Sequence, residues 1–191
     1  MNTFLIADLH LSHEGSCKWL NEDGYPIRPF ANAAEMDEAI IENWNSVVKP
    51  CDKTYVLGDV AMKRSALPLL ARMSGKKVLV KGNHDIFKLG DYTPYFYDIR
   101  GSHKLDNFLL THIPVHKDSL ARWCGGNIHG HLHNNRVMKA RWYRDEEDEW
   151  NVISDVIDPQ YYCVSLEHIN YTPIAFEDVK ALMKKQQGET E

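Results

Sequence analysis

Three short, largely apolar runs in the first half of the chain each end in polar residues. The runs are 3–7, 53–57 and 77–80, and they are followed by Asp8, by Gly58-Asp59 and by Gly82-Asn83. Runs of this length that stop at turn residues are typical of buried strands. Ligand-binding groups gather beyond the carboxyl ends of parallel strands. The pattern therefore predicts a polar site at one edge of a sheet.

The segments between these runs favour an α/β fold. Residues 35–48 have apolar side chains at helical spacing, with Asn32 as a plausible cap, and a second helix is predicted at 65–73. Alternation of strand and helix predicts parallel pairing, whereas the shorter runs after Pro94 favour antiparallel pairing. We predict one α/β domain over residues 1–191, layered with helices outside the sheet. Residues 134–160 show no clear pattern and are predicted to lie near the site or on the surface.

Composition limits the kinds of partner. The 191 residues carry a net charge of −5, so no overall positive field attracts nucleic acid, and positive charge for a phosphate has to be supplied locally. The cysteines are far apart in sequence and are expected to be reduced thiols of a cytoplasmic protein; they are Cys17, Cys51, Cys124 and Cys163. No apolar stretch approaches the roughly 20 residues of a membrane span, and we expect no membrane partner.

Metal-binding residue types are concentrated where the predicted strands end. The chain has ten histidines, and several lie in the segments Asp8-Leu9-His10, Thr111-His112 and 129–133. A set of Asp, Asn and His without thiolates suits Mn, Fe, Zn, Ni or Co. Side chains two positions apart point the same way in extended backbone, so each Asp/His or His/His pair is expected to reach one ion. The glycines at 58, 82 and 130 allow tight turns and a close approach of the backbone.

In order, the segments DLH, GDV, KGNHD, TH and HGHLH resemble the five signature motifs of the calcineurin-like metallophosphoesterase superfamily, and they span residues 8 to 133. The segments DLHLSH, RPF, ENWNSVV and NIHGHLH are most similar to its small bacterial and phage phosphoesterases. The resemblance implies a layered β-sandwich with mixed parallel and antiparallel sheets and flanking helices. It also implies two divalent ions, with Mn as the first choice. The implied ligands are Asp8, His10 and His133 for one ion, Asp59 as the bridge, and Asn83, His112 and His131 for the other.

The resemblance also implies catalytic roles. His84 would stay unligated as the general acid, with Asp85 orienting its ring, while a hydroxide shared by the ions attacks phosphorus in line. Arg28 and His13 are implied phosphate contacts at the rim of the site.

The substrate class follows from a departure from one branch of the superfamily. Phosphoprotein phosphatases carry GDxxDRG, with an arginine that grips a monoester, whereas this chain has GDVAMKR. We therefore expect a phosphodiester substrate, such as a cyclic nucleotide, a nucleic-acid end or a small diester. A phosphomonoesterase acting on a nucleotide or small metabolite is the alternative, since Lys63, Arg64 or Arg28 would replace the missing arginine. A non-catalytic metal-binding scaffold is a third hypothesis, which the presence of His84 disfavours. The sequence does not determine the oligomeric state.

Other aromatic and histidine residues have simpler interpretations. His103, His116 and His168 are expected on the surface or in loops, and His129 is expected to turn away from the metals. The tryptophans are interpreted as packing groups: Trp44, Trp123, Trp142 and Trp150. The acidic run 145–149 is expected to be a solvated face that repels nucleic acid.

Overall fold

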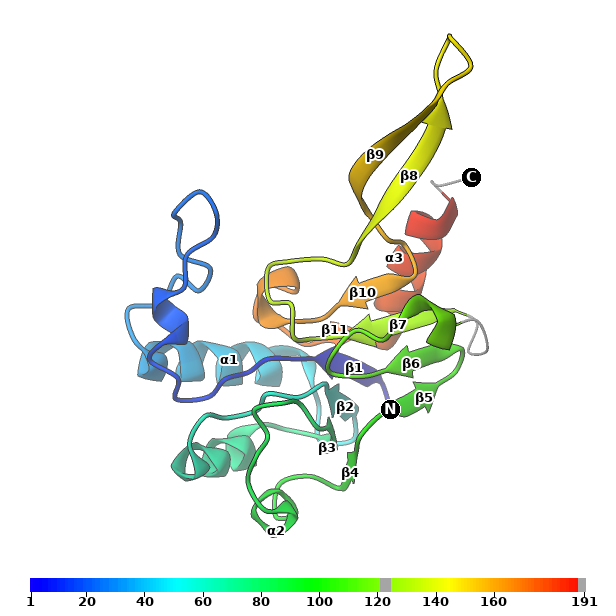
Figure 1. The fold of residues 1–191 in the computed structure, drawn as a ribbon. Coiled ribbons are helices and arrows are strands. Elements are labelled where there is room, and N and C mark those ends of the chain that lie inside the picture. Colours follow the sequence, from blue (N-terminus) through cyan, green and yellow to red (C-terminus); the bar gives the residue numbers. More distant parts are fainter. Residues whose placement is uncertain (121–124, 189–191) are drawn as a thin grey trace.

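The computed structural model describes residues 1–120 and 125–188, so that Trp123 and Cys124 lie outside the described residues. Its first sheet has five strands in the order β11-β1-β2-β3-β4 (Figure 1). Their bounds are β1 Thr3–Ile6, β2 Lys53–Val56, β3 Lys76–Val80, β4 Asp98–Arg100 and β11 Ile174–Ala175. β1 to β4 pair in parallel, as predicted for the first half, and β11 runs antiparallel to β1.

A second sheet has the strand order β10-β7-β6-β5. Its strands are β5 His103–Leu105, β6 Phe108–Leu110, β7 Gly126–His129 and β10 Tyr161–Cys163. Only β5 and β6 pair antiparallel, while β7 pairs in parallel with both β6 and β10. The predicted antiparallel second half is therefore wrong for most of this sheet. The connections that enter and leave β7 are long enough for crossovers, which parallel pairing requires.

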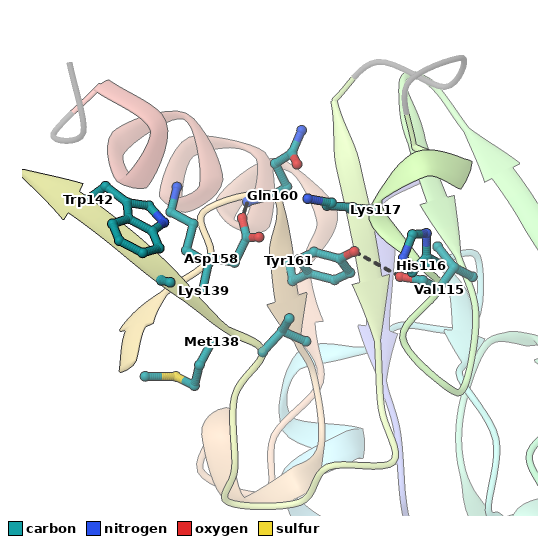
Figure 2. A pocket seen from close by; sticks show the side chains of 11 residues that line it. Val115, His116, Lys117, Met138, Lys139, Trp142, Asp158, Gln160 and Tyr161 are labelled. Carbon is teal, nitrogen blue, oxygen red and sulfur yellow. Dashed lines mark hydrogen bonds between the residues drawn. The ribbon is translucent and has the colours of Figure 1, made fainter. Parts of the chain in front are cut away.

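The segment without a clear sequence pattern forms an antiparallel ribbon of β8 (Met138–Arg144) and β9 (Trp150–Ile157). This ribbon, which we call the arm (residues 138–157), extends away from both sheets (Figure 1). A cavity lies at its base (Figure 2). Trp142 and Trp150 on the arm are 62% and 63% exposed, so the predicted packing role is wrong for them, whereas Trp44 is fully buried as expected.

The helices begin close to where the sequence predicted. α1 (Ala33–Val47) starts at Asn32, whose side chain accepts the Glu35 N–H at 2.9 Å. The helix predicted at 65–73 is instead a 3₁₀ helix, η2 (Arg64–Arg72), with Pro68 inside, and the missing N–H of proline opposes a regular α-helix. The other helices are α2 Leu89–Tyr92, α3 Phe176–Gly188, η1 Ser16–Lys18, η3 Lys117–Ser119 and η4 Leu166–His168. Among the described residues, no helix is both long and apolar enough to cross a membrane.

The first sheet is covered on both faces. Phe4 and Ile6 of β1 belong to a core cluster with Trp44 of α1, whereas Leu5 belongs to a cluster with Leu110 and Ile128 of the second sheet. Alternate residues of a strand point to opposite faces, which explains the division. The protein is thus a mixed α/β fold, with parallel and antiparallel sheets and flanking helices. Its layers bring the carboxyl ends of strands from both sheets to one place.

Candidate metal centre

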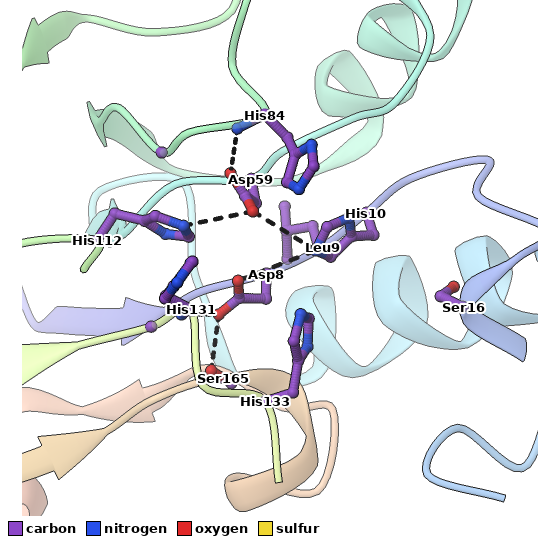
Figure 3. A network of polar contacts seen from close by, with 12 residues as sticks. Asp8, Leu9, His10, Ser16, Asp59, His84, His112, His131, His133 and Ser165 are labelled. Atoms are coloured by element: carbon purple, nitrogen blue, oxygen red, sulfur yellow. Dashed lines mark hydrogen bonds and ion pairs between the residues drawn. The ribbon is translucent and has the colours of Figure 1, made fainter. Parts of the chain in front are cut away.

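Polar side chains from the ends of five strands meet between the two sheets (Figure 3). The Asp59 carboxylate lies centrally, with its Oδ2 3.3 Å from His112 Nε2 and 3.7 Å from His10 Nε2. The same His10 Nε2 lies 3.9 Å from Asp8 Oδ1. Asp59 therefore lies between His10 and His112, which are predicted to bind different ions.

Two groups of side chains have the spacing of metal ligands. One is Asp8, His10 and His133, and the other is Asp8, Asp59 and His112; in each group the ligand atoms lie within 4.8 Å of one another. Asn83 extends the second group, because its Oδ1 lies 2.8 Å from His112 Nε2 and 3.0 Å from His131 Nδ1. The structure thus brings together all the side chains predicted as ligands.

Several buried atoms in this cluster have no partner within the described part of the chain. The His10 side chain is 2% exposed, yet neither of its ring nitrogens has a hydrogen-bond partner, and neither does Asp8 Oδ1. An unsatisfied buried polar group costs about 1–3 kcal/mol. A cation beside His10 Nε2 would satisfy that nitrogen together with Asp8 Oδ1, which lies 3.9 Å from it, so these residues fit a metal ion.

Outer hydrogen bonds at Nδ1 orient the rings of two histidines. His112 Nδ1 lies 2.8 Å from the carbonyl oxygen of Leu57, which can only accept, so Nδ1 carries a proton. His112 Nε2 faces the oxygens of Asn83 and Asp59, which also accept, so an ion bound there would take the place of a second proton. His133 Nδ1 likewise donates to Glu167 Oε1 at 3.1 Å. Such outer bonds are the usual way to orient metal-binding histidines.

Burial and charge set the protonation of the cluster. Burial, and then the charge of Arg28, lowers the pKa of His10, so its ring is neutral, which is the metal-binding form. The pKa of Asp59 is lowered although burial opposes this, because His112 donates to the carboxylate and stands beside it as a cation. For the same reason the pKa of His112 is raised despite its burial, since Asp59 and Asp8 face it. Asp59 and His112 therefore form a charged pair within the cluster.

The backbone of the cluster is unusual. Asp8 (φ 59°), His10 (φ 47°), Asp59 (φ 54°), His131 (φ 71°) and His133 (φ 51°) all lie in the left-handed region. The extended backbone predicted for the Asp8/His10 and His131/His133 pairs is therefore wrong. For L residues this conformation costs about 1 kcal/mol or more each, and such strain clusters at functional sites. The side chains still converge, because alternate residues adopt the same left-handed turn.

Glycines let the loops of the cluster approach one another, as predicted. A Cβ on Gly82 would overlap Asp59 Oδ1, and one on Gly130 would lie 2.6 Å from Asp8 Oδ2. Both contacts are far closer than real Cβ atoms allow. The glycines therefore make room for the two carboxylates.

His84 lies at the open side of the cluster. Its side chain is exposed, its ring centroid is 5.8 Å from that of His10, and its backbone N–H donates to Asp59 Oδ1 at 2.8 Å. Asp85 is buried and accepts the N–H groups of Asp59, Val60 and Gly82 at 2.8–3.0 Å. The Asp85 carboxylate thus joins two loops, and the predicted contact with the His84 ring is not formed among the described residues.

Arg28 lies beneath the cluster and not at its rim, contrary to the prediction. Its fully buried guanidinium donates to the carbonyl oxygens of Asp8 (2.6 Å) and Leu9 (3.3 Å) and to Glu167 Oε1 (2.8 Å). It therefore supports the strained DLH turn. His13 is half-buried, with its ring centroid 5.5 Å from that of His10, and its Nδ1 has no partner in the described ranges.

Three residues of the site were not predicted. Glu167 joins Arg28 to His133, Ser165 Oγ donates to Asp8 Oδ2 at 2.7 Å, and Trp19 packs its ring edge-on against those of His10, His13 and His133. Ser165 and Glu167 follow β10, so a polar strand end was again the available signal. His129 is buried, and its Nδ1 lies 2.7 Å from the Gly130 carbonyl, in agreement with its predicted absence from the ligand set.

Comparison with known proteins gives relatives without a described function. No protein-family model matches the chain. It is 30% identical over 190 residues to the uncharacterized protein MJ1445 of Methanocaldococcus jannaschii, which covers 95% of this chain and 91% of that protein. It is 28% identical over 181 residues to the Gene 66 protein of Mycobacterium phage L5, covering 75% of this chain and 83% of that protein.

A solved structure has the same fold. The crystal structure of the protein of unknown function AQ665 from Aquifex aeolicus superposes with a TM-score of 0.63, covering 95% of this chain and 98% of the other. At 23% identity, this similarity concerns the fold alone.

Proposed function

We propose that this chain, which belongs to the same protein family as the uncharacterized protein MJ1445 of Methanocaldococcus jannaschii, is a phosphoesterase that uses two divalent metal ions. We further propose that its fold is that of the calcineurin-like metallophosphoesterases. The observation that carries the proposal is His10, a buried ring whose two nitrogens lack partners while two carboxylates face it. A structural histidine would be expected to have its nitrogens satisfied.

Seven side chains would hold the ions. Asp8, His10 and His133 would bind one, Asn83, His112 and His131 the other, and Asp59 would bind both. When bound, two such ions neutralise the phosphate oxygens and lower the pKa of the attacking water. Mn is our first choice, with Fe, Zn, Ni or Co as other ions that suit this donor set.

His84 would transfer a proton to the leaving oxygen. Its ring is exposed on the open side of the cluster, while its backbone is fixed to the central carboxylate of Asp59. A group held in place by its main chain and free at its ring is suited to general acid catalysis. Because Asp85 is occupied with backbone N–H groups, the orientation of the ring is left to the substrate and to the neighbouring His10.

The positions of the arginines favour a phosphodiester. Arg28 is buried against main-chain carbonyls, and Arg64 forms an ion pair with Asp91 at 3.2 Å and lies over the ring of Phe87. The Arg28 guanidinium is therefore not available to grip the two charges of a monoester, and that of Arg64, although 62% exposed, is directed to Asp91 and Phe87. A cavity of about 470 Å³ borders Asn83 and His112, with Lys81 in its wall. One lysine charge matches the single charge of a diester such as a cyclic nucleotide or a nucleic-acid end.

The proposal is tested with protein loaded in turn with Mn, Zn and Ni. Bis-p-nitrophenyl phosphate and p-nitrophenyl phosphate are compared at equal concentration, and bound metal is measured in the same samples. We expect two ions per chain and faster turnover of the diester. Faster turnover of the monoester would contradict the substrate class, and absence of bound metal under every loading condition would contradict the function. Asp59→Asn should lose both metal and activity, and Asp118→Asn, which changes an exposed carboxylate, should lose neither.

A further inference from the structure

The arm exposes apolar side chains on both of its strands. Those on β8 and β9 are 43–63% exposed, and they are Met138, Trp142, Tyr143, Trp150, Val152 and Ile157. A two-stranded ribbon alone is marginally stable in water, and exposed apolar groups that lie together mark interaction surfaces. The arm is therefore expected to have a partner.

Charge changes sign along the arm. The turn at its tip consists of five consecutive acidic residues, 145–149. Among the described side chains, one of the five is paired with a cation of the arm: Arg144 contacts Asp148 at 2.6 Å and packs over the Trp150 ring at 5.2 Å. Nearer its base, β8 carries Lys139 and Arg141, and Arg136 lies just before the arm. A surface that is acidic at one end and basic at the other is complementary to itself when turned around.

The base of the arm also holds the large cavity, of about 760 Å³ (Figure 2). Val115, Val137, Trp142 and Tyr161 supply apolar wall, and the Tyr161 hydroxyl fixes one side by donating to the Val115 carbonyl at 2.8 Å. Lys117 and Lys139 also line it. The acidic wall residue Asp158 is only 9% exposed, and its Oδ1 accepts the Gln160 N–H at 3.0 Å. The cavity thus suits an aromatic group accompanied by negative charge.

We propose that the arms of two copies of this chain pack antiparallel across a two-fold axis. In this dimer the acidic tip of each arm, with Trp150, docks in the basic cavity at the base of the other. Because the arms are identical in length, both tips reach both bases at once, as a closed two-fold interface requires. Each of the contacts pairs an exposed aromatic with an apolar wall, and acidic residues with lysines.

The exposed aromatics of the arm are too small an area for a stable interface by themselves. An aromatic side chain buries about 150–250 Å² when it is covered completely. Trp142, Tyr143 and Trp150 are 43–63% exposed, so together they offer on the order of 300 Å² of apolar surface. A standard interface takes roughly 800 Å² from each partner, so arm and cavity both have to take part. A nucleic-acid strand is the less suitable occupant, because the acidic tip repels its backbone.

The test measures the mass of the full-length protein in solution by light scattering and sedimentation. We expect wild type at twice the monomer mass, and the monomer mass for the tip variant E146K/E147K and for the base variant K117E/K139E. Trp150→Ser should also dissociate the dimer, whereas Tyr97→Ser, which removes an aromatic 77% exposed elsewhere, should not. Unfolding curves show that each variant is folded.

Mixing the two charge variants gives the decisive result. The lysine tip of one variant then meets the glutamate base of the other, and the unchanged tip meets the unchanged base, so the mixture should regain dimers. A monomeric wild type at its highest soluble concentration, a tip or base variant that stays dimeric, or a mixture that stays monomeric would each overturn the proposal. Binding of a single-stranded oligonucleotide that is lost in K117E/K139E and strengthened in E146K/E147K would identify nucleic acid as the occupant instead.

Discussion

The buried guanidinium of Arg28 donates from Nε to Oε1 of Glu167 over 2.8 Å, an ion pair between residues 139 positions apart. The same oxygen accepts from the ring of His133. Arg28 also holds the carbonyls of the DLH turn, so one buried network connects proposed ligands near the start of the chain to those near residue 133. Arg28 and Glu167 contact the proposed ligands Asp8 and His133, but neither is proposed to bind an ion.

Replacing Glu167 should therefore weaken metal binding. In Glu167→Gln the ring of His133 loses the carboxylate that fixes its Nδ1 proton and raises its basicity. Loss of such an outer partner typically reduces metal affinity 10–100-fold. Titration with Mn, followed by calorimetry, measures the change. Glu177→Gln, at an exposed glutamate paired with Lys180, is the matched control and should bind metal as wild type does; equal affinities in all three proteins would contradict the role given to Glu167.

The same carboxylate should make the stability of the metal-free protein depend on pH. Burial opposes ionisation, but the bond from His133 and the charge of Arg28 lower the pKa of Glu167 to about 2. A group with a lowered folded pKa stabilises the fold above its unfolded pKa of about 4.3, and the stability is lost as pH falls toward 2. We expect about 3 kcal/mol over that interval, from urea unfolding in the presence of chelator. The slope should be smaller in Glu167→Gln, and identical slopes would contradict the prediction.

Replacing Gly82 tests how closely the Asp59 carboxylate is packed. A methyl group there would overlap Asp59 Oδ1, so Gly82→Ala has to displace the carboxylate or the loop. Overpacking of this kind costs about 1–3 kcal/mol, and here it should also reduce bound metal and activity. Gly90→Ala is a suitable control, since nothing lies within 4 Å of its added Cβ. Full metal content in Gly82→Ala would show that Asp59 does not need its present position.

Much of the site could be predicted because its residues are recognisable from the sequence immediately around them. Asp8, Asp59 and His112 each lie within two residues of the end of an apolar run, and the convergence of parallel strand ends needs no knowledge of distant contacts. The left-handed backbone at Asp8 and His10 was not predictable in this way. It depends on the bond that Arg28 donates to Asp8 and on those that Asp8 and His10 donate to the carbonyls after β2, which only the folded chain brings together.

The role of Glu167 and the exposed position of the arm could not be predicted from the sequence. Glu167 reaches the site because β10 pairs in parallel with β7, after an excursion of about 30 residues whose alternation is obscured by exposed aromatics on both faces. Trp142 and Trp150 were assigned to a core that the arm does not have. A pattern that assumes one buried face fails for a ribbon without a partner in its own chain.

Replacing His84 is the sharpest way to separate the chemical step from metal binding. Its ring makes no hydrogen bond among the described residues, while its main chain holds Asp59, so His84→Asn should keep the N–H bond and lose only the proton donor. We expect kcat to fall 10²–10⁴-fold with metal content unchanged, because general acid catalysis contributes about that factor. The loss should be much smaller for a diester with a strongly acidic leaving group, which departs without a proton. Comparing leaving groups of different pKa in wild type and His84→Asn distinguishes a proton donor from a phosphate contact, since a phosphate contact would lower the rate for every leaving group by the same factor.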